Sequence, residues 1–138
     1  MEIGATKVVQ DRLKTTKIEE SKGASLVFCW DTHLTKIKGR NVLFIVNASN
    51  RYTIAMTDIE PRNWNYYTMY IRSVIHGVMQ EMGYSEDQIG QYFKMSGDTT
   101  VTKTHGRKSV GGINRMVMDA QYFGKKLEKE AKYQCELS

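Results

Sequence analysis

The sequence predicts an α+β domain in which an antiparallel sheet of four or five strands is packed by two main helices and two shorter ones. Short apolar segments separated by turn residues dominate residues 26–56 and predict strands. Apolar residues at spacings of three and four dominate residues 64–93 and predict helices. The length of 138 residues fits one domain. We therefore assign residues 1–123 to a single domain and residues 124–138 to a charged C-terminal extension.

The first predicted element is a short helix that Thr6 caps and that ends near Leu13. Its apolar side consists of Val8, Val9 and Leu13. Residues 14–25 are polar throughout most of their length and predict a loop.

Four strands joined by short turns are predicted next, and this order indicates an antiparallel meander. The predicted strands are residues 26–30, 33–38, 42–46 and 52–56. The segment from Val42 to Val46 is apolar at every position, which is typical of a strand covered on both faces. We therefore expect residues 42–46 to form an interior strand.

The main predicted helix spans residues 64–82, about five turns, because its apolar residues recur on one face. Pro61 stands where a first helical turn favours proline. Gly83 provides a C-terminal stop.

A shorter helix is predicted to begin at Ser85, which with Gln88 three residues later resembles a capping box. Gly97 ends this helix. The β-branched residues of segment 99–104 predict a last strand. Ser109 is then placed to cap a last helix.

The net charge of +5 is concentrated in two parts of the chain. Residues 1–40 carry eight basic and five acidic side chains, and residues 99–115 carry four basic and no acidic ones. Such an excess favours a polyanion or an acidic protein as partner. The alternative is a solvated surface that only keeps the protein soluble.

The best candidate for a binding segment is residues 102–115, where cations and neutral hydrogen-bonding groups lie together. Its candidate binding residues are Lys103, His105, Arg107, Lys108, Ser109, Asn114 and Arg115. A strand, a basic turn and a helix N-terminus would together present the groups that hold phosphate oxygens. In the alternative interpretation Ser109 caps the helix, Asn114 ties the turn to the sheet, and the cations are only solvated.

No catalytic residue, metal ligand or cofactor is predicted. The sequence contains no HExxH, CxxC, GxSxG or P-loop pattern. We expect His33 at a strand edge and His76 facing solvent. An enzyme whose site is assembled only in three dimensions is left open as a third functional class.

The two cysteines, Cys29 and Cys135, lie near opposite ends of the chain and cannot form a disulfide framework. Neither has a cysteine or histidine partner at metal-ligand spacing, and Cys29 in its apolar strand is interpreted as an inert small hydrophobe. No signal peptide is visible, and the longest apolar run is far too short to span a membrane. We therefore expect a cytoplasmic protein with no membrane partner.

A second candidate binding feature is a group of aromatic residues: Trp30, Trp64, Tyr66, Tyr67 and Tyr70. Aromatic rings beside cations would suit stacking on single-stranded bases. Aromatic residues at helical spacing are also typical of a core, and Trp64 and Tyr67 fit the predicted core face.

Several segments together form a pattern: Ala5-Thr6-Lys7, the Phe-x-Trp of residues 28–30, the apolar strand from Val42 that ends at Asn47, the Arg51-Tyr52 strand start, and T-K-T-x-x-R-x-S-V-x-G-x-N over residues 102–114. Over residues 3–118 the chain resembles a family of small uncharacterised bacterial proteins, a domain of unknown function. One departure is Lys108, which stands between Arg107 and Ser109 where the family usually has arginine directly followed by serine. The resemblance implies one domain and a bacterial or phage-like origin, and it carries over no catalytic residue.

Together these observations predict a non-enzymatic binding protein whose basic turn contacts a polyanion, with nucleic acid as the first candidate. The alternative is a small inhibitor or adaptor, of a phage or mobile-element type, that binds a host protein of the nucleic-acid machinery. In that case the basic surface would meet an acidic protein surface and exclude its nucleic acid. The oligomeric state is not predicted.

Overall fold

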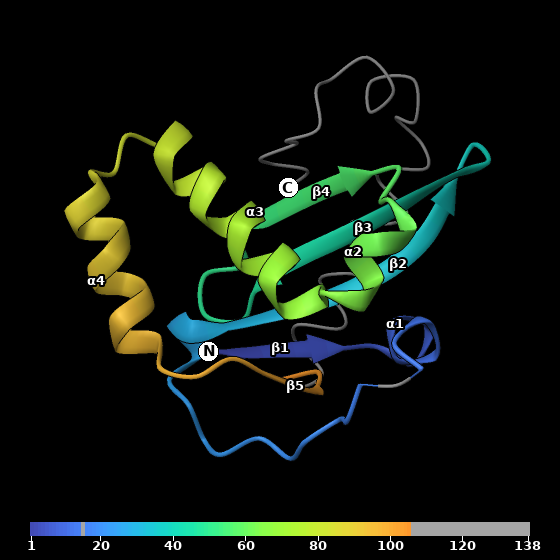
Figure 1. Ribbon diagram of the computed structural model, residues 1–138, viewed down its shortest axis with the longest axis horizontal. Coiled ribbons are helices and arrows are strands. Elements are labelled where there is room, and N and C mark those ends of the chain that lie inside the picture. The colour runs from blue at the N-terminus through green and yellow to red at the C-terminus, as the bar shows by residue number, and fades with distance from the viewer. Residues whose placement is uncertain (15, 106–138) are drawn as a thin grey trace.

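The computed structural model describes residues 1–14 and 16–105 of the chain. Among these residues, five strands form one sheet in the spatial order β4-β3-β2-β1-β5 (Figure 1). The strands are β1 Glu2–Ala5, β2 Cys29–Ile37, β3 Arg40–Asn47, β4 Thr53–Thr57 and β5 Thr100–Lys103. The pairs β2–β3 and β3–β4 are antiparallel, as the predicted meander requires, and β1 runs parallel to both β2 and β5. The predicted α+β class is confirmed, and the sheet is mixed but mostly antiparallel.

Strand β1 is the element that the sequence pattern did not predict. It has four residues, and among them only Ile3 is a good β-former, whereas Gly4 weakens a strand. All four are nevertheless buried, because β1 lies between two neighbours and its backbone groups find partners on both sides. The register places Glu2 level with Cys29 on β2 and with Thr100 on β5.

Strand β2 replaces two of the predicted strands. Segments 26–30 and 33–38 were expected as separate strands, but β2 runs without a break from Cys29 to Ile37, and a 3₁₀-helix at Leu26–Phe28 precedes it. The acidic residue Asp31 makes an apolar strand appear to end there. In the structure Asp31 is fully buried and paired, so the strand continues through it.

Strand β3 confirms the interior strand predicted at residues 42–46, because it pairs with β2 on one side and β4 on the other. The hairpin between β2 and β3 has two loop residues, Lys38 and Gly39, both with positive φ (50° and 80°). That geometry is the type I′ turn that suits the twist of a hairpin.

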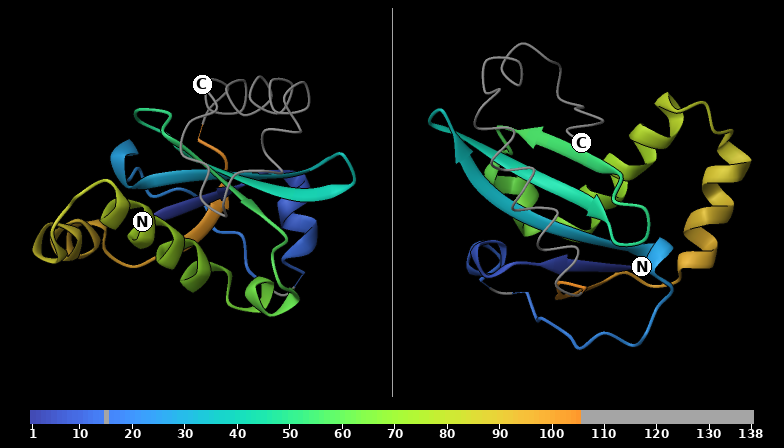
Figure 2. Two further views of the ribbon diagram at one scale, coloured as in Figure 1. Left: turned by 90° about the horizontal axis from the view of Figure 1, so that it is seen from above. Right: turned by 180° about the vertical axis from the view of Figure 1, so that it is seen from behind.

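Four α-helices accompany the sheet within the described residues: α1 Lys7–Arg12, α2 Pro61–Asn65, α3 Tyr67–Glu81 and α4 Glu86–Ser96. Seen from above, they lie on one side of the sheet (Figure 2). The single helix predicted over residues 64–82 is in fact α2 followed by α3, because Tyr66 (φ −123°, ψ 46°) leaves the helical conformation. Trp64 and Tyr67 remain stacked across this break, with ring centroids 5.4 Å apart.

Helix α4 begins and ends as its sequence predicts. Ser85 accepts a hydrogen bond from the backbone N–H of Gln88, and the Gln88 side chain accepts one from the backbone of Ser85, which is the reciprocal capping box. Gly97 closes the helix with φ 69°, a conformation that glycine adopts without steric cost.

The two faces of the sheet differ in what they bury. The helix-facing side forms the main core, in which Ile3 of β1 and Trp30 of β2 pack with Ile71 and Ile75 of α3. Because side chains alternate along a strand, Glu2 and Asp31 project from the opposite face. That opposite face also carries a second buried cluster, made of Ile37, Val42, Phe44 and Ala55.

Among the residues that the structure describes, no helix is long and apolar enough to cross a membrane. The predicted helix after Ser109 and the charged extension at residues 124–138 lie outside the described residues.

Candidate functional site

Three charged side chains from separate strands meet on the sheet face opposite the helices. Glu2 comes from β1, Asp31 from β2, and His105 from two residues beyond the end of β5. The Nδ1 atom of His105 lies 2.6 Å from Oδ1 of Asp31, and its Nε2 atom lies 2.8 Å from Oε1 of Glu2. The backbone N–H of His105 also donates to both carboxylate oxygens of Asp31, at 3.1 Å each. We call Glu2, Asp31 and His105 the buried triad.

The buried triad is almost inaccessible to water. The exposed fractions of the side chains are 5% for Glu2, 0% for Asp31 and 7% for His105. Ionised carboxylates only accept hydrogen bonds, so an imidazole between two of them is favoured in its doubly protonated form. The hydrogen bond with Asp31 is the main cause that raises the pKa of His105; burial opposes it, and the contact with Glu2 adds to it. The triad thus favours a proton on each ring nitrogen of His105.

Glu2 is stabilised as a carboxylate although it is buried. Burial by itself would raise its pKa, but hydrogen bonds from the Ser21 hydroxyl, His105 and the Lys22 backbone N–H together lower the pKa to about 2. Ser21 Oγ donates to Oε1 at 2.7 Å and Lys22 N–H donates to Oε2 at 2.9 Å. Both oxygens of Glu2 are therefore engaged.

Cys29 lies beside the triad, so its surroundings are more polar than its apolar sequence context suggests. Its side chain is buried, and Sγ lies 4.0 Å from Oε1 of Glu2. Burial, followed by the negative charges of Glu2 and Asp31, raises the pKa of this thiol to about 11. The thiol is thus neutral at ordinary pH and sits next to a carboxylate and an imidazole.

A glycine makes room for the triad. A Cβ atom added at Gly4 would lie 2.0 Å from Oδ1 of Asp31 and 3.0 Å from Cα of Thr104. No side chain larger than hydrogen fits there while Asp31 keeps its position. Gly4 therefore explains how a carboxylate can lie flat against the neighbouring strand.

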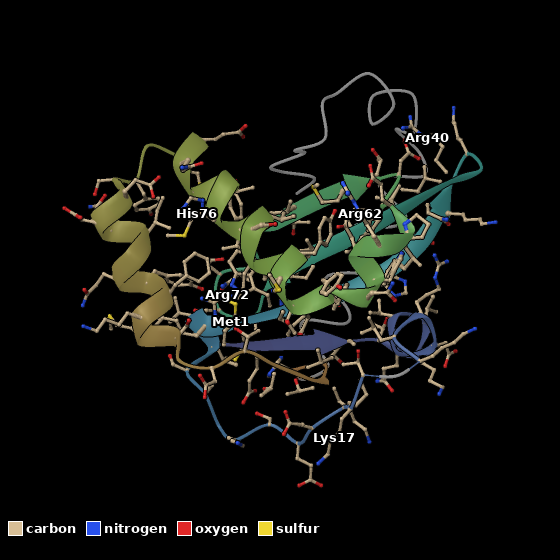
Figure 3. The ribbon with its side chains drawn as sticks, viewed as in Figure 1. Met1, Lys17, Arg40, Arg62, Arg72 and His76 are labelled. Atoms are coloured by element: carbon tan, nitrogen blue, oxygen red, sulfur yellow. The ribbon has the colours of Figure 1, made fainter. Side chains whose placement is uncertain are left out.

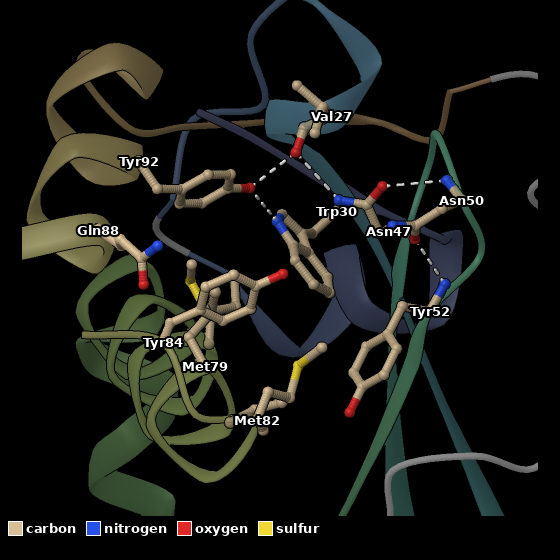
Figure 4. A pocket seen from close by; sticks show the side chains of 12 residues that line it. Val27, Trp30, Asn47, Asn50, Tyr52, Met79, Met82, Tyr84, Gln88 and Tyr92 are labelled. Carbon is tan, nitrogen blue, oxygen red and sulfur yellow. Dashed lines mark hydrogen bonds between the residues drawn. The ribbon is translucent and has the colours of Figure 1, made fainter. Parts of the chain in front are cut away.

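A separate apolar pocket of about 310 Å³ opens at the other face, between α3, α4 and the start of β2 (Figure 4). Its lining residues are mainly aromatic and aliphatic, with a few amides: Val27, Trp30, Asn47, Asn50, Tyr52, Ile75, Val78, Met79, Met82, Tyr84, Gln88 and Tyr92. The Tyr92 hydroxyl accepts from Nε1 of Trp30 at 2.9 Å and donates to the Val27 carbonyl at 2.7 Å. Met82 and Tyr84 are 50% and 45% exposed. A cavity of this size and lining suits a small ligand or a partner's side chain.

The family of this chain is identified by a match over nearly its whole sequence. A family model described as a domain of unknown function, DUF6933, matches residues 2–138. The chain belongs to the DUF6933 family. The resemblance to an uncharacterised domain family is thereby confirmed, and the matched range also includes residues 124–138, which the resemblance had left out. No curated protein and no solved structure matches this chain.

The binding segment predicted for this DUF6933 chain is only partly described. Lys103 is exposed at the end of β5. His105 instead turns inward, and both of its ring nitrogens contact carboxylates rather than solvent. The remaining candidate residues, Arg107, Lys108, Ser109, Asn114 and Arg115, lie outside the described residues.

The other two histidines of the DUF6933 chain differ from expectation. His33 was expected at a strand edge, but it lies within β2 opposite Phe44, and its Nδ1 atom is 2.9 Å from the Thr6 hydroxyl. His76 was expected to face solvent, but it is only partly exposed and projects from α3 toward α4 (Figure 3). There it contacts Glu86 at 3.2 Å and stacks on Phe93.

The aromatic residues also separate into two groups. Trp64 and Tyr67 are buried in the main core, as their spacing predicts, whereas Tyr66 is 66% exposed. Trp30 is a pocket residue of the DUF6933 chain, and its Nε1 donates a hydrogen bond to the Tyr92 hydroxyl. Sequence spacing could not reveal this pocket, because its lining residues come from several separate elements and loops.

Proposed function

We propose that the protein is a non-enzymatic binding protein whose basic segment, residues 102–115, contacts a polyanion, and that nucleic acid is the class this segment suits best. The observation that supports the proposal is the anchoring of His105. Its backbone N–H and both ring nitrogens are held by Asp31 and Glu2. The basic segment therefore starts from a fixed point on the sheet, which lowers the entropy lost when its cations engage a ligand.

The anchoring also divides the roles within the segment. Because the His105 ring is engaged by two carboxylates, it positions the segment and does not contact phosphate itself. The phosphate contacts are assigned to Lys103, which is exposed, and to Arg107, Lys108 and Arg115. Cations of this kind supply the salt-dependent part of nucleic-acid binding. A cytoplasmic location is part of the same proposal.

Changing Arg107 and Lys108 together to alanine is expected to weaken binding to DNA or RNA. The slope of log affinity against log salt should also fall by about one unit for each phosphate group that the protein no longer neutralises. The free energy of unfolding should change by less than about 0.5 kcal/mol, because exposed cations contribute little to folding. The measurement is a salt titration of the wild type and the double variant against DNA and RNA.

The matched control removes the same charge elsewhere. Lys36→Ala combined with Lys94→Ala takes away two exposed cations, one on β2 and one on α4, and should leave the salt slope nearly unchanged. If the wild type has no measurable affinity for either nucleic acid at low salt, the polyanion proposal is wrong.

The apolar pocket favours a second function, that of an adaptor or inhibitor that binds one host protein. Phosphate groups gain nothing from a pocket lined by Trp30, Tyr92 and Met82, whereas an aromatic or aliphatic side chain of a protein partner fits it. Met82 and Tyr84 leave its rim about half exposed, and methionine adapts readily to a partner's shape. The basic segment would then meet a separate, acidic part of the partner's surface.

Under this second function, Met82→Glu is expected to weaken binding to the partner protein about tenfold or more, because it places a carboxylate on the pocket rim. Met69→Glu is the control, since Met69 lies on α3, the helix that Met82 directly follows, is 68% exposed and does not line the pocket. Affinities would be measured by calorimetry with a partner recovered by crosslinking and then purified. Equal reductions of affinity in both variants would exclude the pocket as the contact site.

A further inference from the structure

We propose that Glu2, Cys29 and His105 form a transition-metal site, and that Zn²⁺ is the ion it suits best. One ligand atom from each residue, a carboxylate oxygen, a thiol sulfur and an imidazole nitrogen, lies within 4.8 Å of the other two. The three residues come from β1, the start of β2 and the segment after β5, so only the fold brings them together. This inference is independent of the proposed binding function.

The separations are close to those of a tetrahedral zinc site. Zinc bonds of about 2.0–2.3 Å place neighbouring ligand atoms roughly 3.3–3.6 Å apart. Here Oε1 of Glu2 is 2.8 Å from Nε2 of His105 and 4.0 Å from Sγ of Cys29. The imidazole nitrogen and Sγ of Cys29 lie within 4.8 Å of each other, so relative shifts of up to about 1 Å would bring these three atoms around one ion.

A second observation points to a metal, and it is the position of Asp31. A histidine that binds zinc usually donates its other ring N–H to a carboxylate, which fixes the tautomer and aims the free nitrogen at the ion. Asp31 occupies that place, 2.6 Å from Nδ1 of His105, and is completely buried. It also accepts from the backbone N–H of His105, which fixes the backbone that carries the ring. Nε2 therefore points at Glu2, the second residue of the proposed site.

The donor set selects the class of ion. One sulfur, one imidazole nitrogen and one carboxylate oxygen suit Zn²⁺ and related borderline-soft ions, whereas Mg²⁺ and Ca²⁺ prefer oxygen alone. On binding, Zn²⁺ replaces the proton between Nε2 of His105 and Glu2, and the Cys29 thiol loses its proton. Both protons go to solvent. The ion, the thiolate and the Glu2 carboxylate then sum to zero charge.

On the Glu2 side, the site is covered by a loop. The cover on that side is the Ser21–Lys22 segment, which contacts the carboxylate through one hydroxyl and one backbone N–H. These residues belong to neither a helix nor a strand. A bound ion would join β1, β2 and the end of β5, and binding should therefore raise the thermal stability of the chain.

The test is a titration of the full chain with Co²⁺, which substitutes for Zn²⁺ and is coloured. We expect about one equivalent to bind, with a near-ultraviolet thiolate-to-cobalt band and tetrahedral visible bands that Zn²⁺ abolishes. Cys29→Ser should remove the thiolate band, whereas Cys135→Ser, the matched change at the other cysteine, should keep it. Asp31→Asn should keep the band and weaken the affinity about 10–100-fold.

Each result decides the proposal. A wild-type titration without a thiolate band, or a band that survives Cys29→Ser and disappears in Cys135→Ser, would overturn it. The wild-type titration stands alone if Cys29→Ser fails to fold, and circular dichroism of each metal-free variant identifies that case. Nucleic-acid binding measured with and without a chelator tests the proposed function separately.

Discussion

Gly4→Ala is expected to destabilise the protein by about 3 kcal/mol or more, a large effect for the addition of one methyl group. The new Cβ would lie 2.0 Å from Oδ1 of Asp31, so the carboxylate must move. Its movement breaks the hydrogen bonds with the backbone and ring of His105, and disrupting a buried ion pair typically costs about 3–5 kcal/mol. Urea unfolding of the wild type and the variant measures the difference.

The same substitution elsewhere in the chain should have the opposite sign. Gly90 lies inside helix α4, and a Cβ there meets no atom within 4 Å. Gly90→Ala should therefore stabilise the protein by about 0.5–1 kcal/mol, because alanine is the better helix former. In an Asp31→Ala background the cost of Gly4→Ala should fall to about 1 kcal/mol, since the clashing carboxylate is absent. An unchanged cost in that background would show that Asp31 is not what Gly4 makes room for.

Those parts of the fold that depend on local pattern could be predicted from the sequence. The continuous apolar run at Val42–Val46 marks an interior strand, and Ser85 with Gln88 marks a helix start. Helix α1 was placed correctly, although Thr6 makes no side-chain capping bond, because its hydroxyl contacts His33 instead. Where a local pattern and a tertiary contact compete for one side chain, only the structure can decide.

The buried triad could not be predicted, for the same physical reason. Glu2 and His105 are separated by 103 positions, and they meet only because β1 inserts between β2 and β5. Strand β1 itself lacks a strand pattern. It is held in place by pairing with β2 on one side and β5 on the other, and this pairing is not visible in its own four residues. One signal was available: Asp31 directly follows an apolar run, and a carboxylate in a buried strand requires a partner. The identity of that partner required the fold.

The triad and the pocket also explain why one chain supports two functional proposals. They lie on opposite faces of the sheet, and they differ in chemistry, because one is charged and sealed while the other is apolar and open. For a variant at one of the two sites, binding at the other site therefore serves as an internal control. Met82→Glu should leave cobalt binding intact, and Cys29→Ser should leave the pocket intact.

The second large effect is expected from Phe44→Asp, which should lower the free energy of unfolding by about 4 kcal/mol or more. Phe44 is fully buried on the sheet face opposite the helices, where it packs with Ile37, Val42 and Ala55. Removal of a buried phenylalanine side chain alone typically costs about 3–5 kcal/mol. The new carboxylate adds the cost of a buried charge without a cationic partner. Thermal and urea unfolding measure the decrease.

Tyr66→Asp makes the same kind of exchange, aromatic to aspartate, at an exposed position and is the matched control for Phe44→Asp. Tyr66 is 66% exposed and stands at the N-cap of α3, where aspartate is a favoured residue. We expect this variant to stay within about 0.5 kcal/mol of the wild type. If instead Phe44→Asp keeps wild-type stability, β3 cannot be an interior strand covered on both faces, and the sheet order β4-β3-β2 must be wrong.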